Sequence, residues 1–348
     1  MARSLDYTKC MTAKWLSISA AAILSLPTYA LSAGPQDPPK FRSSVEVVSV
    51  TAVVKDRKGR FVSDLKQDDF VINEGGAQKR ILDFRAETDG PVKLGLLVDA
   101  SGSMRVGQKA VDAREAARHL FGALRPTDEA ALFSFDTRLD KVSPFTSNTA
   151  ALDEALGRLN VPYGQTSLYD AIGEAATFVA EQGRGEGRLP QRTALVVLTD
   201  GIDTSSRHTT EQVAAIASRI DVPVYIIAVM SPIDDPRTDE TPSFDVTGLQ
   251  QLARSTGGDM FTASAPAHAS VAARQIIGEL RHQYVLAFEA SSRPGWRGIA
   301  VEARDKKLSV RARTGYSAGG SSRPTPAPVA GVTFESYAVI PAAACGTL

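Results

Sequence analysis

The chain has 348 residues, 43% of them hydrophobic, which is enough for one large domain with smaller pieces and an ordinary buried core. Lys and Arg together number 39, and so do Asp and Glu, so no global field draws the protein to nucleic acid or to an anionic membrane. Nucleic-acid binding would need a local basic patch, and none stands out in the sequence.

The N-terminus has the pattern of a secretory signal peptide, which we expect over residues 1–33. Positively charged residues precede an apolar run at 15–26, and small residues follow it. That run is shorter than the roughly 20 residues that a membrane-spanning helix needs. We therefore predict an exported protein of the periplasm, cell envelope or extracellular space, which contacts a membrane only if the signal stays uncleaved. Cys10 would leave with the signal and Cys345 lies near the C-terminus, so we expect no internal disulfide.

A small β module is expected at 45–90, after a polar linker at 34–44. Residues 45–54 alternate and are β-branched, and short strand-like runs follow at 70–73 and 80–84, separated by glycines. A few strands bury little surface alone, so we expect this module to pack on another part of the chain.

From residue 91 to 281 the pattern changes to β–α alternation, which predicts a doubly wound, Rossmann-like α/β sheet with helices on both faces. The expected strands lie at 93–98, 130–135, 139–145, 194–198, 223–229 and 260–261. The expected helices lie at 110–124, 149–159, 168–182, 210–220, 246–256 and 267–281.

A second β segment is expected at 282–316, with strand-like runs at 283–288, 298–303 and 308–312. We expect these strands to pack with the N-terminal β module into one β-sandwich, because neither half has many strands alone. Residues 317–348 begin as a Gly/Ser/Pro-rich linker that cannot bury a core and end in a tail with no clear role.

Three pieces of the α/β region carry oxygen ligands where a strand or loop gives way to a helix. They are Asp99-Ala-Ser-Gly-Ser103, Thr166 and Asp200. The carboxyl ends of parallel strands share one edge of a sheet, so Asp99, Ser101, Ser103, Thr166 and Asp200 are predicted to meet there. Three hydroxyls and two carboxylates suit Mg²⁺, with Mn²⁺ and Ca²⁺ as alternatives. We expect such a site to favour an external carboxylate in its open coordination position.

This constellation resembles the metal-ion-dependent adhesion site (MIDAS) of von Willebrand factor type A (VWA) domains, over roughly residues 92–281. The family signature is Asp-x-Ser-x-Ser with a distant Thr and a distant Asp, and the five positions match without departure. Residues 68–84, 283–286 and 311–316 are similar to the exported VWA-related domain family of acidobacteria. The resemblance implies a bacterial, secreted, Mg²⁺-dependent protein-binding or cell-adhesion module.

Other readings of these residues are weaker. The Asp and Ser side chains could simply cap a helix. Ser101 lacks the Gly-x-Ser-x-Gly context of a hydrolase nucleophile and no His stands in a partner motif, so we predict no catalytic residues and no enzyme. Asp203 either solvates its loop or holds a metal-bound water, and Asp170 is expected at a helix start. No phosphate-binding loop is present, and the four histidines form no zinc pattern.

We therefore predict an exported module that binds a carboxylate of a partner protein through a Mg²⁺-type ion and uses no other cofactor. The alternative is a scaffold or assembly subunit of an envelope complex that captures no ligand through a metal. Binding predicts an affinity that a chelator abolishes, whereas scaffolding predicts partners that survive chelation.

Overall fold

The structure is a computed structural model, and its described residues fall within the single unit Ser44–Leu348. The described ranges are 47–87, 90–160, 164–183, 192–230, 246–291 and 293–318. The predicted signal peptide, the linker after it and most of the predicted C-terminal tail lie outside these ranges. Among the described helices, none is both long enough and apolar enough to cross a membrane.

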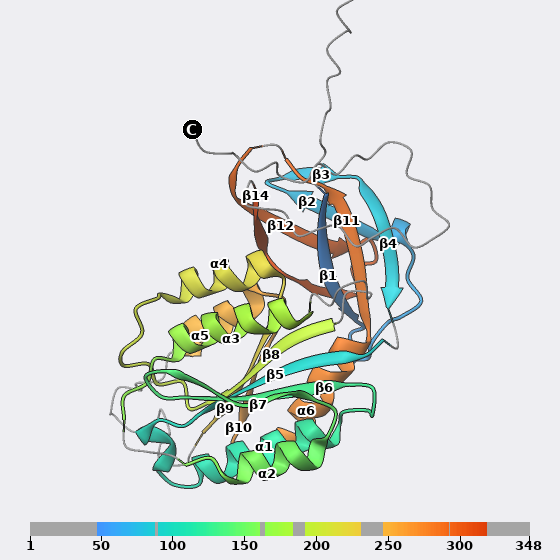
Figure 1. Cartoon of the computed structure of the whole chain (residues 1–348). Helices are drawn as coiled ribbons and strands as arrows, with labels where there is room; N and C mark the ends of the chain where they lie inside the picture. The colour runs from blue at the N-terminus through green and yellow to red at the C-terminus, as the bar shows by residue number, and fades with distance from the viewer. Residues whose placement is uncertain are drawn as a thin grey trace, which may run out of the picture. The chain divides into compact units, whose positions relative to one another are not determined.

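A six-stranded sheet with strand order β10-β9-β8-β5-β6-β7 forms the centre of the α/β region (Figure 1). Its strands are β5 (Val92–Asp99), β6 (Glu129–Phe135), β7 (Leu139–Thr146), β8 (Arg192–Thr199), β9 (Val224–Val229) and β10 (Met260–Ala263). All neighbouring pairs are parallel except β6 and β7. That antiparallel edge follows from the short connection between β6 and β7, because parallel neighbours need a long crossover.

Helices cover both faces of this sheet, as the alternation predicts. They are α1 (Lys109–Gly122), α2 (Thr149–Gly157), α3 (Leu168–Gly183), α4 (Thr210–Ile220), α5 (Val246–Ser255) and α6 (Pro266–Arg281), with a short 3₁₀ turn η2 (Gly102–Arg105) before α1. Helices α1, α2 and α6 pack on one face and α3, α4 and α5 on the other (Figure 1). Each face has its own buried apolar core, built largely from alanine and branched aliphatic side chains.

The two β segments form the expected sandwich. The N-terminal segment supplies β1 (Val47–Lys55), the 3₁₀ turn η1 (Gln67–Asp69), β2 (Phe70–Glu74), β3 (Ala77–Lys79) and β4 (Ile81–Glu87). The C-terminal segment supplies β11 (Gln283–Glu289), β12 (Gly295–Ala303), β13 (Ser309–Ala312) and β14 (Gly315–Ala318). The strand orders are β13-β1-β11-β4 and β14-β12-β2-β3, so each sheet mixes strands from both segments. One apolar core lies between the two sheets.

Ion pairs join the sandwich to the last helix of the α/β region. Glu279 of α6 is fully buried and pairs with Lys55 of β1 at 2.6 Å and with Arg311 of β13. Arg311 also pairs with Asp259, which precedes β10. The end of α6 is therefore fixed to two strands of the sandwich.

Candidate functional site

The two carboxylates of the predicted site lie on adjacent strands of the central sheet. The β5–β8 register aligns Val98 with Leu198, so Asp99 ends β5 beside the end of β8, and Asp200 follows β8 directly. Asp99 is 1% exposed, and its Oδ2 accepts a hydrogen bond from Thr199 Oγ1 at 2.6 Å. Its Oδ1 accepts from the Ser101 backbone N–H at 2.9 Å. Both carboxylates are thus at the carboxyl edge of the sheet, where the sequence placed them.

The serines belong to the turn that follows β5. The Ala100 N–H donates to the Phe135 carbonyl at 2.8 Å, which anchors this turn to the end of β6. Ser101 is buried and Ser103 half-buried, and their hydroxyl oxygens are 3.0 Å apart. The two hydroxyls of the Asp-x-Ser-x-Ser motif therefore point the same way, as the spacing of two residues predicts.

Thr166 lies in the loop before α3, which hydrogen bonds join to the rest of the site. The Gly102 N–H donates to the Gly164 carbonyl at 3.3 Å, which links this loop to the serine turn. The Thr166 N–H donates to Thr204 Oγ1 at 2.8 Å, and the Thr166 carbonyl accepts from the N–H groups of Thr204 and Ser205, both at 2.9 Å. Thr204 lies in the loop that follows Asp200, so the three loops that carry the five predicted residues are held against one another.

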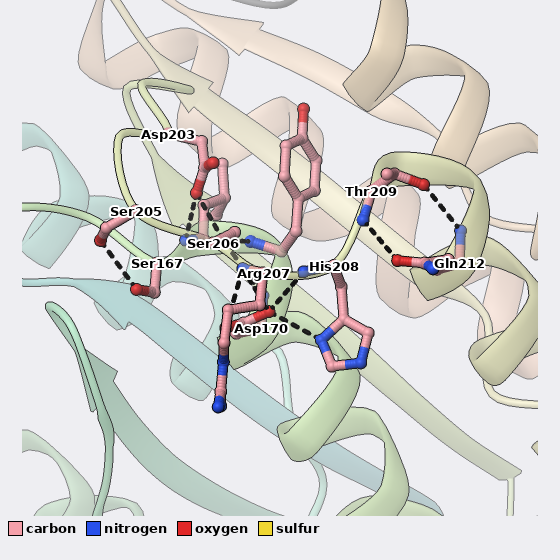
Figure 2. A network of polar contacts seen from close by, with 11 residues as sticks. Ser167, Asp170, Asp203, Ser205, Ser206, Arg207, His208, Thr209 and Gln212 are labelled. Carbon is pink, nitrogen blue, oxygen red and sulfur yellow. Dashed lines mark hydrogen bonds and ion pairs between the residues drawn. The ribbon is translucent and has the colours of Figure 1, made fainter.

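A polar network extends this contact to the start of α3 (Figure 2). Asp203 Oδ1 accepts from the Leu168 N–H at 2.8 Å and from Ser206 Oγ at 2.6 Å. Ser206 Oγ in turn accepts from the Tyr169 N–H at 3.0 Å. The Asp203 carboxylate thus caps the start of α3, a role that the sequence did not suggest.

Asp170, in the first turn of α3, holds the far end of the same loop (Figure 2). Its Oδ1 accepts from the His208 N–H at 2.9 Å and contacts His208 Nδ1 at 2.7 Å, and both of its oxygens accept from the Arg207 N–H. Burial disfavours the charged carboxylate, but the hydrogen bonds from His208 and Arg207 outweigh it and lower the pKa of Asp170 to about 2. The loop 203–208 is thus fixed to α3 by the carboxylates of Asp203 and Asp170.

Lys109 is a member of the site that the sequence did not reveal. It is the first residue of α1, is 3% exposed, and its Nζ donates to Asp200 Oδ2 at 3.0 Å. A single lysine at a helix start belongs to no ligand motif, so no signal in the sequence pointed to this contact. Thr199 was missed for the same reason, although it directly precedes Asp200.

The electrostatics of the site suit a small hard cation. Burial, with a further contribution from the Asp200 charge, raises the pKa of Asp99 to about 6, against hydrogen bonds from Ser101 and Thr199. A cation beside the two carboxylates would favour their ionised forms. Within the described ranges, no group of three or more His, Cys, Asp or Glu side chains is placed to hold a metal, so a metal here would depend on hydroxyl ligands. Carboxylate and hydroxyl oxygens are the ligands of Mg²⁺, Ca²⁺ and Mn²⁺ rather than of softer metals.

Comparison with known proteins gives a family match within the α/β region. Residues 94–202 match the family model of the von Willebrand factor type A domain. This match spans the Asp-x-Ser-x-Ser turn, Thr166 and Asp200. A comparison with the sequences of curated proteins gives no match.

Several solved structures are also similar to this chain at low identity. A von Willebrand factor type A structure from Catenulispora acidiphila matches with a TM-score of 0.46 and 13% identity, over 80% of this chain and 74% of that one. The conserved hypothetical protein BatB from Bacteroides thetaiotaomicron matches at 0.43 and 19%, over 53% and 97%. Proximal thread matrix protein 1 from the mussel byssus, with a zinc-occupied MIDAS motif, matches at 0.44 and 14%, over 56% of this chain and 49% of that one.

Proposed function

We propose that this VWA-type region holds a Mg²⁺-type cation at Asp99, Ser101, Ser103, Thr166 and Asp200 and binds an acidic group of a partner protein through it. The observation that carries the proposal is the joining of three loops, each with oxygen ligands, at the carboxyl edge of one sheet. When bound, the cation supplies an open coordination position for a carboxylate oxygen. The chain's own residues fix the ligands and exclude water from all of them except Ser103, which is half-buried.

The same geometry favours binding over catalysis. The nearest hydroxyl partner of Ser101 is Ser103, and no histidine is among the hydrogen-bond partners of Ser101 in the described part of the chain. A serine nucleophile needs an adjacent base, so we assign no catalytic role to it. We further propose that the protein is exported and meets its partner at the cell envelope, as the pattern of residues 1–33 indicates.

Calorimetric titration of the mature protein with Mg²⁺, Mn²⁺, Ca²⁺ and Zn²⁺ tests the metal site. Ser101→Ala and Asp200→Asn should each weaken binding by at least about tenfold, the loss that even outer-shell changes cause. Ser143→Ala is the matched control, because its hydroxyl lies on β7 and, among the described residues, donates only to the adjacent Pro144 carbonyl, at 3.3 Å. Equal metal affinity in the wild type and all three variants would show that these residues do not form the metal site.

A capture experiment tests the partner. The immobilised protein is incubated with envelope extract in Mg²⁺ or in EDTA, and the Ser101→Ala variant is run beside it. Metal-dependent capture that the variant loses supports the proposal. Partners that remain bound in EDTA favour the alternative, a scaffold or assembly subunit without metal-dependent ligand capture.

A further inference from the structure

Lys109 places a positive charge inside the candidate metal site, on one of its two carboxylates. We propose that Lys109 is a built-in counter-ion that competes with the divalent cation for Asp200, so that the site binds metal tightly only when an acidic ligand binds with it. This inference rests on the proposed function and adds to it a coupling between metal and ligand.

The surroundings of Lys109 argue that its ion pair is a feature of the site. Lysine is almost never fully buried unless it is paired, and the side chains of Lys109 and Asp200 are only 3% and 1% exposed. Lys109 is also the first residue of α1, where the helix dipole disfavours a positive charge. Asp200 offsets both costs, with the 3.0 Å contact between Nζ and Oδ2. In the metal-free protein, Asp200 is therefore already neutralised by the chain itself.

The charges explain how this ion pair couples metal to ligand. With both carboxylates ionised, as metal ligands are, Asp99, Asp200 and Lys109 together carry one negative charge. A divalent cation changes this to one positive charge, whereas the same site without Lys109 would become neutral. The cation therefore meets a repelling ammonium and must share Asp200 with it. A carboxylate from a partner removes the surplus charge and stabilises the loaded site.

The test is the affinity for Mg²⁺ and Mn²⁺ of the wild type, Lys109→Met and Lys109→Gln, measured by calorimetry with the metal alone. Both variants should bind metal at least about tenfold more tightly, because a unit charge within a few ångströms of a divalent ion is removed from a site of low dielectric. The glutamine can still donate to Asp200 and guards against loss of fold in the methionine variant. Lys93→Met is the matched control, since Lys93 pairs with Glu129 and lies at the opposite end of β5 from Asp99.

A second titration repeats the measurement with a capped peptide that carries one glutamate side chain. The peptide should tighten metal binding by the wild type and by Lys93→Met, and do so less for the Lys109 variants. If the wild type binds metal and both Lys109 variants bind it with the same or a lower affinity, this inference alone is overturned. Lys109 would then only position Asp200. Absence of metal binding in every form, with and without peptide, would overturn the proposed function and this inference with it.

Discussion

The residue after Asp200 is a glycine in a left-handed backbone conformation. Gly201 has a φ of +79°, in the left-handed region, and its N–H donates to Thr199 Oγ1 at 2.9 Å. The Thr199 hydroxyl in turn donates a hydrogen bond to Asp99 Oδ2. The backbone conformation of Gly201 therefore helps to fix the hydroxyl that donates to Asp99.

Replacing this glycine should destabilise the protein. Gly201→Ala puts a Cβ on a left-handed residue and should lower the free energy of unfolding by about 1–2 kcal/mol. Urea denaturation of the metal-free protein measures this. Gly157→Ala is the control, because Gly157 ends α2 with nothing near its Cβ and an ordinary φ, so its stability should stay level or rise slightly. A similar loss in both variants would contradict the argument.

Glu74, at the end of β2 in the sandwich, is a buried carboxylate with several polar partners. It pairs with Lys79 at 2.7 Å and accepts hydrogen bonds from Ser291 and Tyr316. Burial opposes its charge, but these contacts outweigh burial and lower its pKa from 4.5 to about 2. The ionised carboxylate of Glu74 thus connects β2 to the C-terminal strands.

The stability that Glu74 contributes should therefore depend on pH. A carboxyl with a lowered folded pKa stabilises the native state above its unfolded pKa and loses that contribution as pH falls through the folded value. The difference in unfolding free energy between wild type and Glu74→Gln should be constant above about pH 5 and shrink between about 4.5 and 2. Denaturant titrations at several pH values measure it, and a difference that does not change over this range would refute the assignment.

At the scale of elements, the loop 203–208 contacts both the start of α3 and the segment that carries Thr166. It caps α3 through Asp203 (Figure 2). Through Thr204 it also holds the backbone of Thr166. The position of a predicted ligand is therefore tied to the stability of a helix start.

Asp203→Ala should show this link. It removes the acceptor of the Leu168 N–H and should lower the free energy of unfolding by about 1 kcal/mol, as loss of a helix cap does. Because the same loop holds Thr166, metal affinity should fall as well. Asn148→Ala is the control, since Asn148 caps α2 through the Ala151 N–H at 3.1 Å and should cost similar stability without changing metal affinity. If both variants have the same metal affinity, the loop 203–208 does not help to position the metal ligands.

Elements with a strong pattern were predictable from the sequence. The helix at 210–220 appears as α4 with the expected bounds, and the strand-end motif was enough to bring Asp99 and Asp200 to one edge. The short strands β3 and β14, of three and four residues, were not predicted, because such runs carry little periodicity. Contacts such as the one between Lys109 and Asp200 depend on side chains 91 residues apart and leave no local pattern.

At the scale of the whole molecule, Glu279 joins the sandwich to the α/β region. Lys55 and Arg311 reach it from two strands of one sheet, and its side chain is fully buried on α6. A shift of α6 would have to break this buried pair. We therefore expect the sandwich and the α/β region to respond to ligand as one body.

Removing the Glu279 charge should be costly and should weaken this connection. Glu279→Gln takes the buried carboxylate away from Lys55 and Arg311, whose side chains are 19% and 20% exposed, while Arg311 keeps its pair with Asp259, and should lower the free energy of unfolding by about 1–3 kcal/mol. Calorimetry should show the sandwich and the α/β region unfolding separately in this variant. Glu154→Gln, which alters an exposed pair with Arg158, should change stability by less than about 1 kcal/mol. One unaltered transition for Glu279→Gln would show that other contacts join the two parts.

The mixed sheets of the sandwich also set the order in which the chain can fold. Strand β1 lies between β11 and β13, and Glu74 is bonded to a tyrosine 242 residues further along. During synthesis, β1 emerges without either of its neighbours while the α/β region between the two segments is completed. Pairings this distant form late and slowly, and unpaired strand edges associate with other chains in the meantime. The N-terminal strands are thus the part of the protein that most needs protection from aggregation before the last strands arrive.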